Sequence, residues 1–157
     1  MSQSISTRVA ELGLTLEPAA APAANYVSFV REGNVVHISG QIARRGDTVP
    51  YTGQLGAEVT ETDGIEAARL CALGVIAQIA AVTEDRLDRV ARVMKLGVFV
   101  ASAPGFSKQS VVANGASDLL VEVFGEAGRH ARSAVGVAML PAASAVEVDA
   151  TIALHPF

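Results

Sequence analysis

The sequence predicts an α+β fold in which a mixed β-sheet is covered by helices on one face. Short runs rich in valine and isoleucine alternate with two long helical patterns, in the order ββ-α-β-α-ββ. The chain has 157 residues, half of them hydrophobic, which is enough to bury a core of its own and excludes intrinsic disorder. No repeat of fixed period interrupts this order, so we expect a single domain over residues 1–157.

Residues 1–24 are expected to form an N-terminal helix and a Pro/Ala-rich extension of that domain. The apolar residues of 7–14 lie at helical spacing, and Thr7 is a candidate cap for a short helix there. Pro18 and Pro22 frame an alanine-rich run that cannot continue the helix, so we expect a loop packed along a surface.

The clearest strand signal is a β-hairpin formed by residues 26–31 and 35–42. Two β-branched runs flank Gly33 and Asn34, which tolerate the positive φ of a tight turn. The glycine- and proline-rich residues 44–56 that follow are expected to form a long surface loop.

A long helix with a broad apolar face is predicted to run to Val82, with Thr62 or Asp63 as its N-cap. One more turn over residues 85–90 leads into a largely buried strand over residues 91–101.

A second helix is predicted over residues 107–124, and Gly125 and Gly128 end it. Strands over residues 131–140 and 145–154 close the chain.

The last two predicted strands carry charged residues on defined faces. Alternation places Arg132 and Ala134 on one face of their strand, and Glu147 and Asp149 on one face of theirs. If the two strands formed a hairpin, Asp149 or Thr151 would be the simple partner of Arg132, in a cross-strand salt bridge or hydrogen bond.

Charge and hydropathy narrow the classes of partner. The chain carries 12 Lys and Arg against 16 Asp and Glu, a net charge of −4, and no basic stripe, so we expect no nucleic-acid partner. The most apolar stretch, residues 70–82, is shorter than the roughly 20 residues that span a bilayer, so we expect no membrane partner. Residues 1–7 are polar and show no leader pattern, so we expect a cytoplasmic protein.

The residues that bind metals and cofactors are scattered. Cys71 is the one cysteine, which excludes an intramolecular disulfide, and its place on the apolar side of a helix indicates a core residue. His37, His130 and His155 lie far apart, and the sequence has no nucleotide-binding loop or Gly-x-Ser-x-Gly motif. We therefore expect no metal and no cofactor. The mean hydropathy of +0.38 favours a core shared between copies, hence an oligomer.

Two motifs near the ends of the chain point to a known family. The stretch ARSAVGVAMLPAASAVEVDATIAL, residues 131–154, contains an Arg-Ser pair, a strand, Leu-Pro, a turn and a glutamate in the last strand. Near the other end stand Tyr26-Val27, Gly33-Asn34 and Ser39-Gly40-Gln41-Ile42. Both patterns resemble those of the YjgF/RidA family, once called L-PSP endoribonucleases, and the resemblance covers nearly the whole chain.

This resemblance implies a chorismate-mutase-like fold with two helices on one face of the sheet, in a homotrimer with ligand clefts between subunits. It implies hydrolysis of reactive 2-imino or enamino acids, such as 2-iminopropanoate and 2-aminoacrylate, to 2-keto acids and ammonia. By position, Arg132 matches the family arginine that holds the substrate carboxylate, and Glu147 matches the glutamate that orients or activates water. Tyr26 matches a tyrosine that lines the cleft, and Ser39 with Gly40 matches the turn into it.

Other positions depart from the family pattern. Ser133 keeps the Arg-Ser pair, but Ala134 stands where active imine deaminases of the family usually have cysteine. Ser117 aligns with a family asparagine, with Asn114 one turn earlier as an alternative, and His130 replaces a residue that is usually proline or alanine. A non-catalytic trimeric binder of small carboxylates therefore stays open as the alternative, while the net charge and the few aromatic residues disfavour an endoribonuclease.

Overall fold

The computed structural model describes residues 3–156 and places five strands in one sheet. The helices are α1 (Ile5–Glu11), α2 (Glu61–Thr83) and α3 (Gln109–Phe124), and the strands are β1 (Phe29–Glu32), β2 (Val35–Ile42), β3 (Val90–Ala101), β4 (Ala131–Val137) and β5 (Val146–Leu154). Short 3₁₀ turns occupy Leu87–Arg89, Gly125–Gly128 and Pro141–Ala143.

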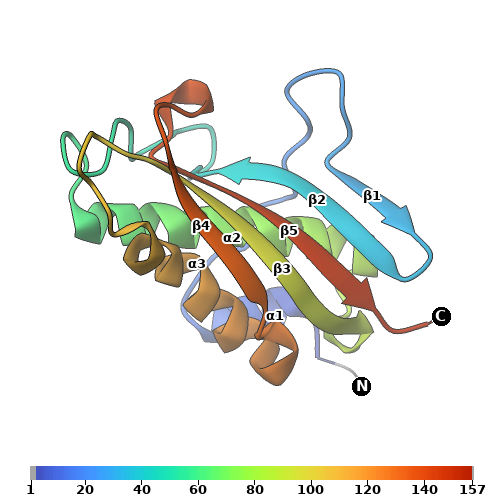
Figure 1. Ribbon diagram of the computed structural model, residues 1–157. Coiled ribbons are helices and arrows are strands. Elements are labelled where there is room, and N and C mark those ends of the chain that lie inside the picture. The colour runs from blue at the N-terminus through green and yellow to red at the C-terminus, as the bar shows by residue number, and fades with distance from the viewer. Residues whose placement is uncertain (1–2, 157) are drawn as a thin grey trace.

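The sheet is mixed, with the strand order β1-β2-β5-β3-β4. Strands β3 and β4 are parallel, and the other neighbours are antiparallel. Both long helices lie on one face of the sheet, with β1 and β4 at its two edges (Figure 1). The predicted α+β class and the helices on one face are confirmed.

The core lies between this face of the sheet and the helices. Along β5 every second side chain is buried, from Val146 to Leu154, because the pleat turns those residues toward α2. The helices approach each other closely at Gly115 of α3, where a Cβ atom would collide with the backbone of Ile65. Cys71 is fully buried in this core, as predicted, and burial raises the pKa of its thiol well above the usual value.

Helix α2 begins at a different cap from those predicted. Thr60, not Thr62 or Asp63, precedes the first turn, and its hydroxyl accepts a hydrogen bond of 3.1 Å from the backbone N–H of Asp63. The helix spans 23 residues, so by length and composition alone it could cross a membrane. The apolar stretch over residues 70–82 that was recognised in the sequence is shorter and did not indicate this. Half of its most apolar window is buried inside the fold, where α2 packs against α3 and the sheet.

The predicted hairpin of the last two strands is wrong, because β3 lies between them. Strand β4 pairs in parallel with β3 after the crossover through α3, and β5 fills the gap between β2 and β3. Strand β4 also ends at Val137, earlier than predicted, and the chain then turns through Pro141–Ala143. A central place for β5 satisfies its backbone groups on both sides.

The N-terminal part of the chain departs most from the prediction. Helix α1 is capped by Ser4, one turn before Thr7, and runs over Ile5–Glu11. Residues 13–28, which we call the strap, then cross α2 and reach β2 at Ser39, just beyond its pairing with β1. The first three residues of the predicted strand 26–31 belong to the strap.

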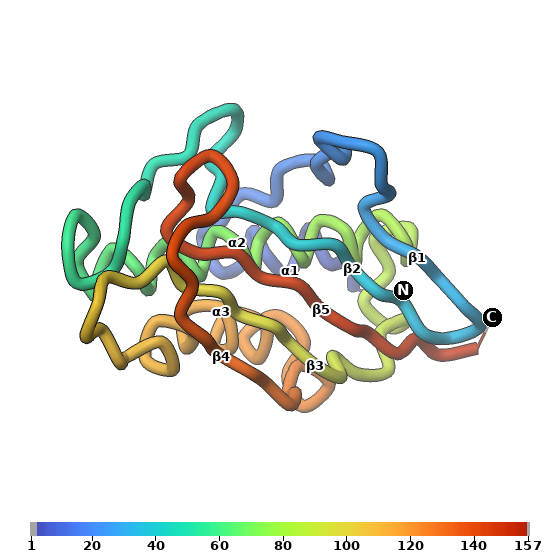
Figure 2. The backbone as a smooth tube through the Cα atoms, turned by 45° about the horizontal axis from the view of Figure 1, so that its top comes forward, coloured from blue at the N-terminus to red at the C-terminus, as the bar shows by residue number. Residues whose placement is uncertain are grey.

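The predicted surface loop after β2 is partly buried. Leu55 is inaccessible to solvent, and its backbone bonds to Ala101 and Ala103 beside the end of β3. Figure 2 shows this loop running beside the turn before β5, where Gly53 donates a backbone hydrogen bond to Ala143. Long-range pairing of this kind leaves no periodic signal in the sequence.

Candidate functional site

Arg132 lies on the helix-covered face of the edge strand β4. It is in register with Leu96, which is fully buried against the helices. Its Nη1 donates to Asn114 Oδ1 at 2.9 Å and to Ser117 Oγ at 3.1 Å, and its Nη2 donates to the Ser110 carbonyl at 3.1 Å. All three acceptors come from α3, so the helix fixes the plane of the guanidinium.

His130 extends this network behind Ser117. Its Nδ1 lies 2.6 Å from the Gly128 carbonyl, and its Nε2 lies 2.8 Å from Ser117 Oγ. A carbonyl only accepts, so Nδ1 carries a hydrogen, and in the neutral ring Nε2 accepts the hydrogen of the Ser117 hydroxyl. The lone pairs of that hydroxyl are then left to face Arg132.

These groups line a shallow hollow of about 240 Å³, which we call the Arg132 pocket. Its lining residues are Ser117, Asp118, Val121, Arg129, His130 and Arg132. Sequence reasoning missed the role of His130 as a hydrogen-bond partner. The available signal was its spacing: residues 130 and 132 of an extended segment share one face.

Glu147 lies on the opposite, uncovered face of the sheet. It is in register with Phe99 on β3, and it is half-buried. Among residues 3–156, no group donates a hydrogen bond to its carboxylate or pairs with it as a cation. Burial, and secondly the negative charge of Asp149, raises the pKa of Glu147 above its usual value. A carboxylate in this state is a stronger base than a solvated one.

The Glu147 carboxylate lies in a second hollow of about 300 Å³, the Glu147 pocket. Tyr26 and Gly40 also line it, and Tyr26 is 49% exposed. Gly40 is required for this arrangement, because a Cβ atom at that position would collide with the carboxylate of Glu147.

Ser39 holds the strap beside this pocket. Its hydroxyl donates to the Val27 carbonyl at 2.7 Å, and its backbone N–H donates to the Ser28 carbonyl at 2.9 Å. The register between β2 and β5 shifts between Ile38 and Gln41, so a bulge at Ser39 and Gly40 turns this part of β2 toward the strap.

The structure therefore brings the predicted residues together in two groups rather than one. Tyr26, Gly40 and Glu147 share one pocket, while Ser117 and Arg132 share the other. Arg132 and Glu147 lie on opposite faces of the same sheet, and within one chain they do not meet.

Two further predicted residues, Ser133 and Ala134, follow Arg132 on β4. Ala134 is in register with Val98 and so shares the face of Arg132, whereas Ser133 is exposed on the opposite face. The pairing of Arg132 with Asp149 or Thr151, which a hairpin would give, is wrong. Both residues lie beyond β3 on the uncovered face of the sheet. Asp149 instead accepts a hydrogen bond of 3.0 Å from the backbone of Gly97.

The structure gives no cluster suited to a metal ion within residues 3–156, where no three His, Cys, Asp or Glu side chains gather. His37 bonds to Thr151 on the uncovered face of the sheet at 3.2 Å. The polar side chains of the two pockets include the guanidinium of Arg132, the Ser117 hydroxyl, the His130 imidazole, the Tyr26 phenol and the Glu147 carboxylate.

Comparison with known proteins gives relatives that match almost the whole chain. Residues 6–152 match the family model described as "YjgF/chorismate_mutase-like, putative endoribonuclease". The Trypanosoma cruzi protein TCP17 is 55% identical over 152 residues, which are 96% of this chain and 94% of TCP17. Atu1372 of Agrobacterium tumefaciens, a protein of unknown function, is 44% identical, with a TM-score of 0.90 over 96% of this chain and 92% of Atu1372.

A more distant solved relative carries a ligand. Escherichia coli TdcF, solved with bound serine, is 26% identical, with a TM-score of 0.59 over 86% of this chain and 92% of TdcF. The strand order, the helices on one face and the extent of these matches agree with one another. This chain belongs to the YjgF/chorismate-mutase-like family.

Proposed function

We propose that this protein is a homotrimeric hydrolase that converts 2-imino and enamino acids to 2-keto acids and ammonia. In this proposal the Arg132 pocket of one copy faces the Glu147 pocket of its neighbour. One observation carries it: an oriented guanidinium and a carboxylate without a hydrogen-bond donor lie in separate open pockets on opposite faces of one sheet. Each pocket holds half of the chemistry that the reaction needs.

Arg132 is suited to binding a carboxylate. A guanidinium has five N–H groups, and α3 uses both hydrogens of Nη1 and one of Nη2. One hydrogen on Nε and one on Nη2 are left, and a guanidinium can bind a carboxylate through this pair of nitrogens. They match the two oxygens of a carboxylate, which fixes the plane of the substrate as well as its position.

Glu147 is suited to the hydrolytic step. The protonated imine carbon is electrophilic, and Glu147 accepts a proton from a water molecule as the water oxygen bonds to that carbon. The proton passes to the nitrogen of the resulting carbinolamine; the C–N bond then breaks with its electron pair on nitrogen, and ammonia leaves. The remaining hydroxyl loses its proton to give the 2-keto acid. The raised pKa of Glu147 favours the first of these transfers, because it makes the carboxylate a stronger base.

The surface of the sheet supports assembly from copies of this chain. The two long helices cover only one face, and large apolar side chains are exposed on the other, among them Val30 and Val135. Apolar groups on an uncovered sheet favour burial against a second copy. The relative TdcF was solved with bound serine, in which a carboxylate and a nitrogen are attached to one carbon, as they are in a 2-imino acid.

The activity is tested by supplying 2-iminopropanoate and 2-iminobutanoate, generated in the assay by an amino-acid oxidase. Release of ammonia and 2-keto acid is followed with wild type, Arg132→Ala and Glu147→Ala. We expect acceleration by the wild type alone. No acceleration by a wild type that binds 2-keto acids through Arg132 would overturn the hydrolase and favour the carboxylate binder, and cleavage of an RNA substrate would favour the family's endoribonuclease description.

The composite site is tested by complementation between the two inactive variants. Arg132→Ala and Glu147→Ala chains are co-expressed with different tags, and mixed trimers are purified through both. A cyclic trimer of the two kinds contains one intact pairing, so about one third of the wild-type sites per mixed trimer should be active. Activity no higher than that of either parent would contradict a site shared between copies.

A further inference from the structure

The strap forms one wall of the Glu147 pocket of its own chain. Ala20, Ala21, Pro22 and Ala23 line the pocket in succession. All four are apolar and short, and the proline fixes one backbone angle. The side chains of this wall therefore offer a ligand only methyl and methylene groups.

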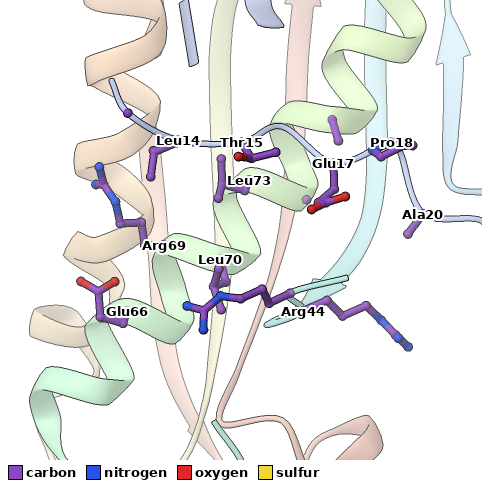
Figure 3. A pocket seen from close by; sticks show the side chains of 14 residues that line it. Leu14, Thr15, Glu17, Pro18, Ala20, Arg44, Glu66, Arg69, Leu70 and Leu73 are labelled. Carbon is purple, nitrogen blue, oxygen red and sulfur yellow. The ribbon is translucent and has the colours of Figure 1, made fainter. Parts of the chain in front are cut away.

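Another hollow, distinct from the Arg132 and Glu147 pockets, lies between the strap and the outer surface of α2 (Figure 3). It measures about 410 Å³, and the apolar side chains of Leu70, Leu73 and Ala77 contribute to its lining. Ala20 and Arg44 line both hollows, so they mark the partition between the two. Charged side chains, among them Glu66 and Arg69, line the rest of this hollow. A displaced strap would open the Glu147 pocket toward the apolar side chains on α2.

The partition is held by two hydrogen bonds to a single carbonyl. Gln78 Nε2 donates to the Ala20 carbonyl at 2.8 Å, and Ser28 Oγ donates to the same oxygen at 3.1 Å. Gln78 is 1% exposed and lies in an otherwise apolar stretch of α2. A buried amide needs a partner, and this one finds it in the backbone of an exposed segment. The bond explains why a polar residue stands at this position.

We infer that the strap, held at Ala20 by Gln78 and Ser28, limits the length of the apolar side chain that the Glu147 pocket accepts. Gln78 acts as a positioning residue, because it touches the strap and does not line the Glu147 pocket. Ser28, the last residue of the strap, lines that pocket as well, so its variant is judged first by hydrogen exchange. The inference rests on the proposed function for the identity of the ligand. It predicts preference for 2-imino acids with short apolar side chains, and loss of that preference when the strap is released.

The test compares Gln78→Leu and Ser28→Ala with a matched control, Thr83→Val. Leucine has nearly the volume of glutamine without its donor. Thr83 is a buried polar residue of the same helix, but its hydroxyl donates at 2.8 Å to the Ile79 carbonyl within that helix and does not touch the strap. Ser28→Ala removes one partly exposed hydroxyl that bonds to the same carbonyl, and it serves as the milder variant if Gln78→Leu folds poorly.

Two quantities are measured on each protein. Hydrogen exchange of the amides in residues 19–25 reports the strap, and kcat/KM for 2-iminopropanoate against 4-methyl-2-iminopentanoate reports selectivity. We expect faster exchange and about a tenfold loss of selectivity for the short substrate in Gln78→Leu, and a smaller loss in Ser28→Ala. Thr83→Val should leave both quantities as in wild type.

Binding of the matching 2-keto acids, pyruvate and 4-methyl-2-oxopentanoate, separates this inference from the proposed function. If the wild type binds them without turning over either imine, the hydrolase fails, and the same loss of selectivity in binding still supports the strap. Unchanged exchange in Gln78→Leu would overturn the tether. Faster exchange with unchanged selectivity would overturn the role of the strap, as would failure to bind either acid.

Discussion

The charged groups of the two pockets differ in the number of hydrogen bonds that they make. Arg132 is held by three hydrogen bonds to α3, with His130 bonded behind Ser117, whereas Glu147 receives no hydrogen bond within the described chain. The first arrangement fixes the direction of a cation that keeps its charge at any ordinary pH. The second leaves a base poorly solvated, which raises its pKa. The difference indicates that one group is built to orient a ligand and the other to exchange a proton.

The largest effect is expected from Glu147→Gln, which removes the base and keeps the shape of the side chain. We expect kcat for 2-iminopropanoate to fall by about a hundredfold or more, because general base catalysis is worth that much. Binding of 2-keto acids, measured by calorimetry, should be unchanged. An equal loss of binding and turnover would show that Glu147 holds the ligand, and the contrast between the pockets would fail.

A smaller effect is expected from Arg132→Lys, which keeps the charge and removes the planar fork. Lysine cannot offer two parallel N–H groups, so we expect pyruvate to bind about tenfold more weakly or worse. Arg129→Lys is the control: it lines the same pocket, but its exposed side chain pairs with Glu126. If both variants bind as wild type does, the pocket attracts anions by charge alone.

The network behind Arg132 should contribute less again. Ser117→Ala removes one hydrogen bond to the guanidinium, and we expect roughly fivefold weaker pyruvate binding, since one such bond is worth about 1 kcal/mol. His130→Ala should have a similar or smaller effect, and almost none when Ser117 is already alanine. Additive losses in the double variant would show that His130 acts on the site by another route than Ser117.

The smallest effect concerns the pH dependence of turnover. Glu147 must be ionised to accept a proton from water, so kcat should fall as the pH falls through its raised pKa. Asp149→Asn removes a negative charge that raises this pKa and retains an oxygen that can accept from Gly97. The acid limb of the kcat profile should move to lower pH, with the plateau rate preserved. If the acid limb of the kcat profile does not move, the ionisation that it reports belongs to a group other than Glu147.

Much of the fold could be predicted because its signals are local. The strand over 35–42 is predicted to the residue, and the long helices and β5 to within a few residues, since apolar spacing and turn residues mark them. The faces of Arg132 and Glu147 on their own strands also follow from alternation. A loop packed along a surface was predicted for residues 18–25, but its contact with Gln78 and the burial of Leu55 depend on distant parts of the chain and were missed. The cap at Thr60 is a local contact that was placed two or three residues too late.

Some residues of the candidate site could be predicted from the sequence, and others were found only in the structure. The family resemblance selects Arg132, Glu147, Tyr26 and Gly40 from the sequence, and residue spacing alone gives no reason to join the first two. The hydrogen-bond partners of His130 and Gln78 are known only from the structure. A histidine at the start of a strand, or a glutamine in an apolar helix, can have many different partners, and the sequence does not say which. Their distances to Ser117 Oγ and to the Ala20 carbonyl give them specific roles.

The sequence by itself determined the kinds of element, their order, and the face that each side chain takes on its own strand, because these follow from periods of two and 3.6 residues. Only the tertiary structure decided that β3 separates β4 from β5, so that Arg132 meets α3 and Glu147 faces away from the helices. Strand order results from pairing between segments far apart in the chain. That choice depends on how all the apolar faces are buried together, and no local pattern records it.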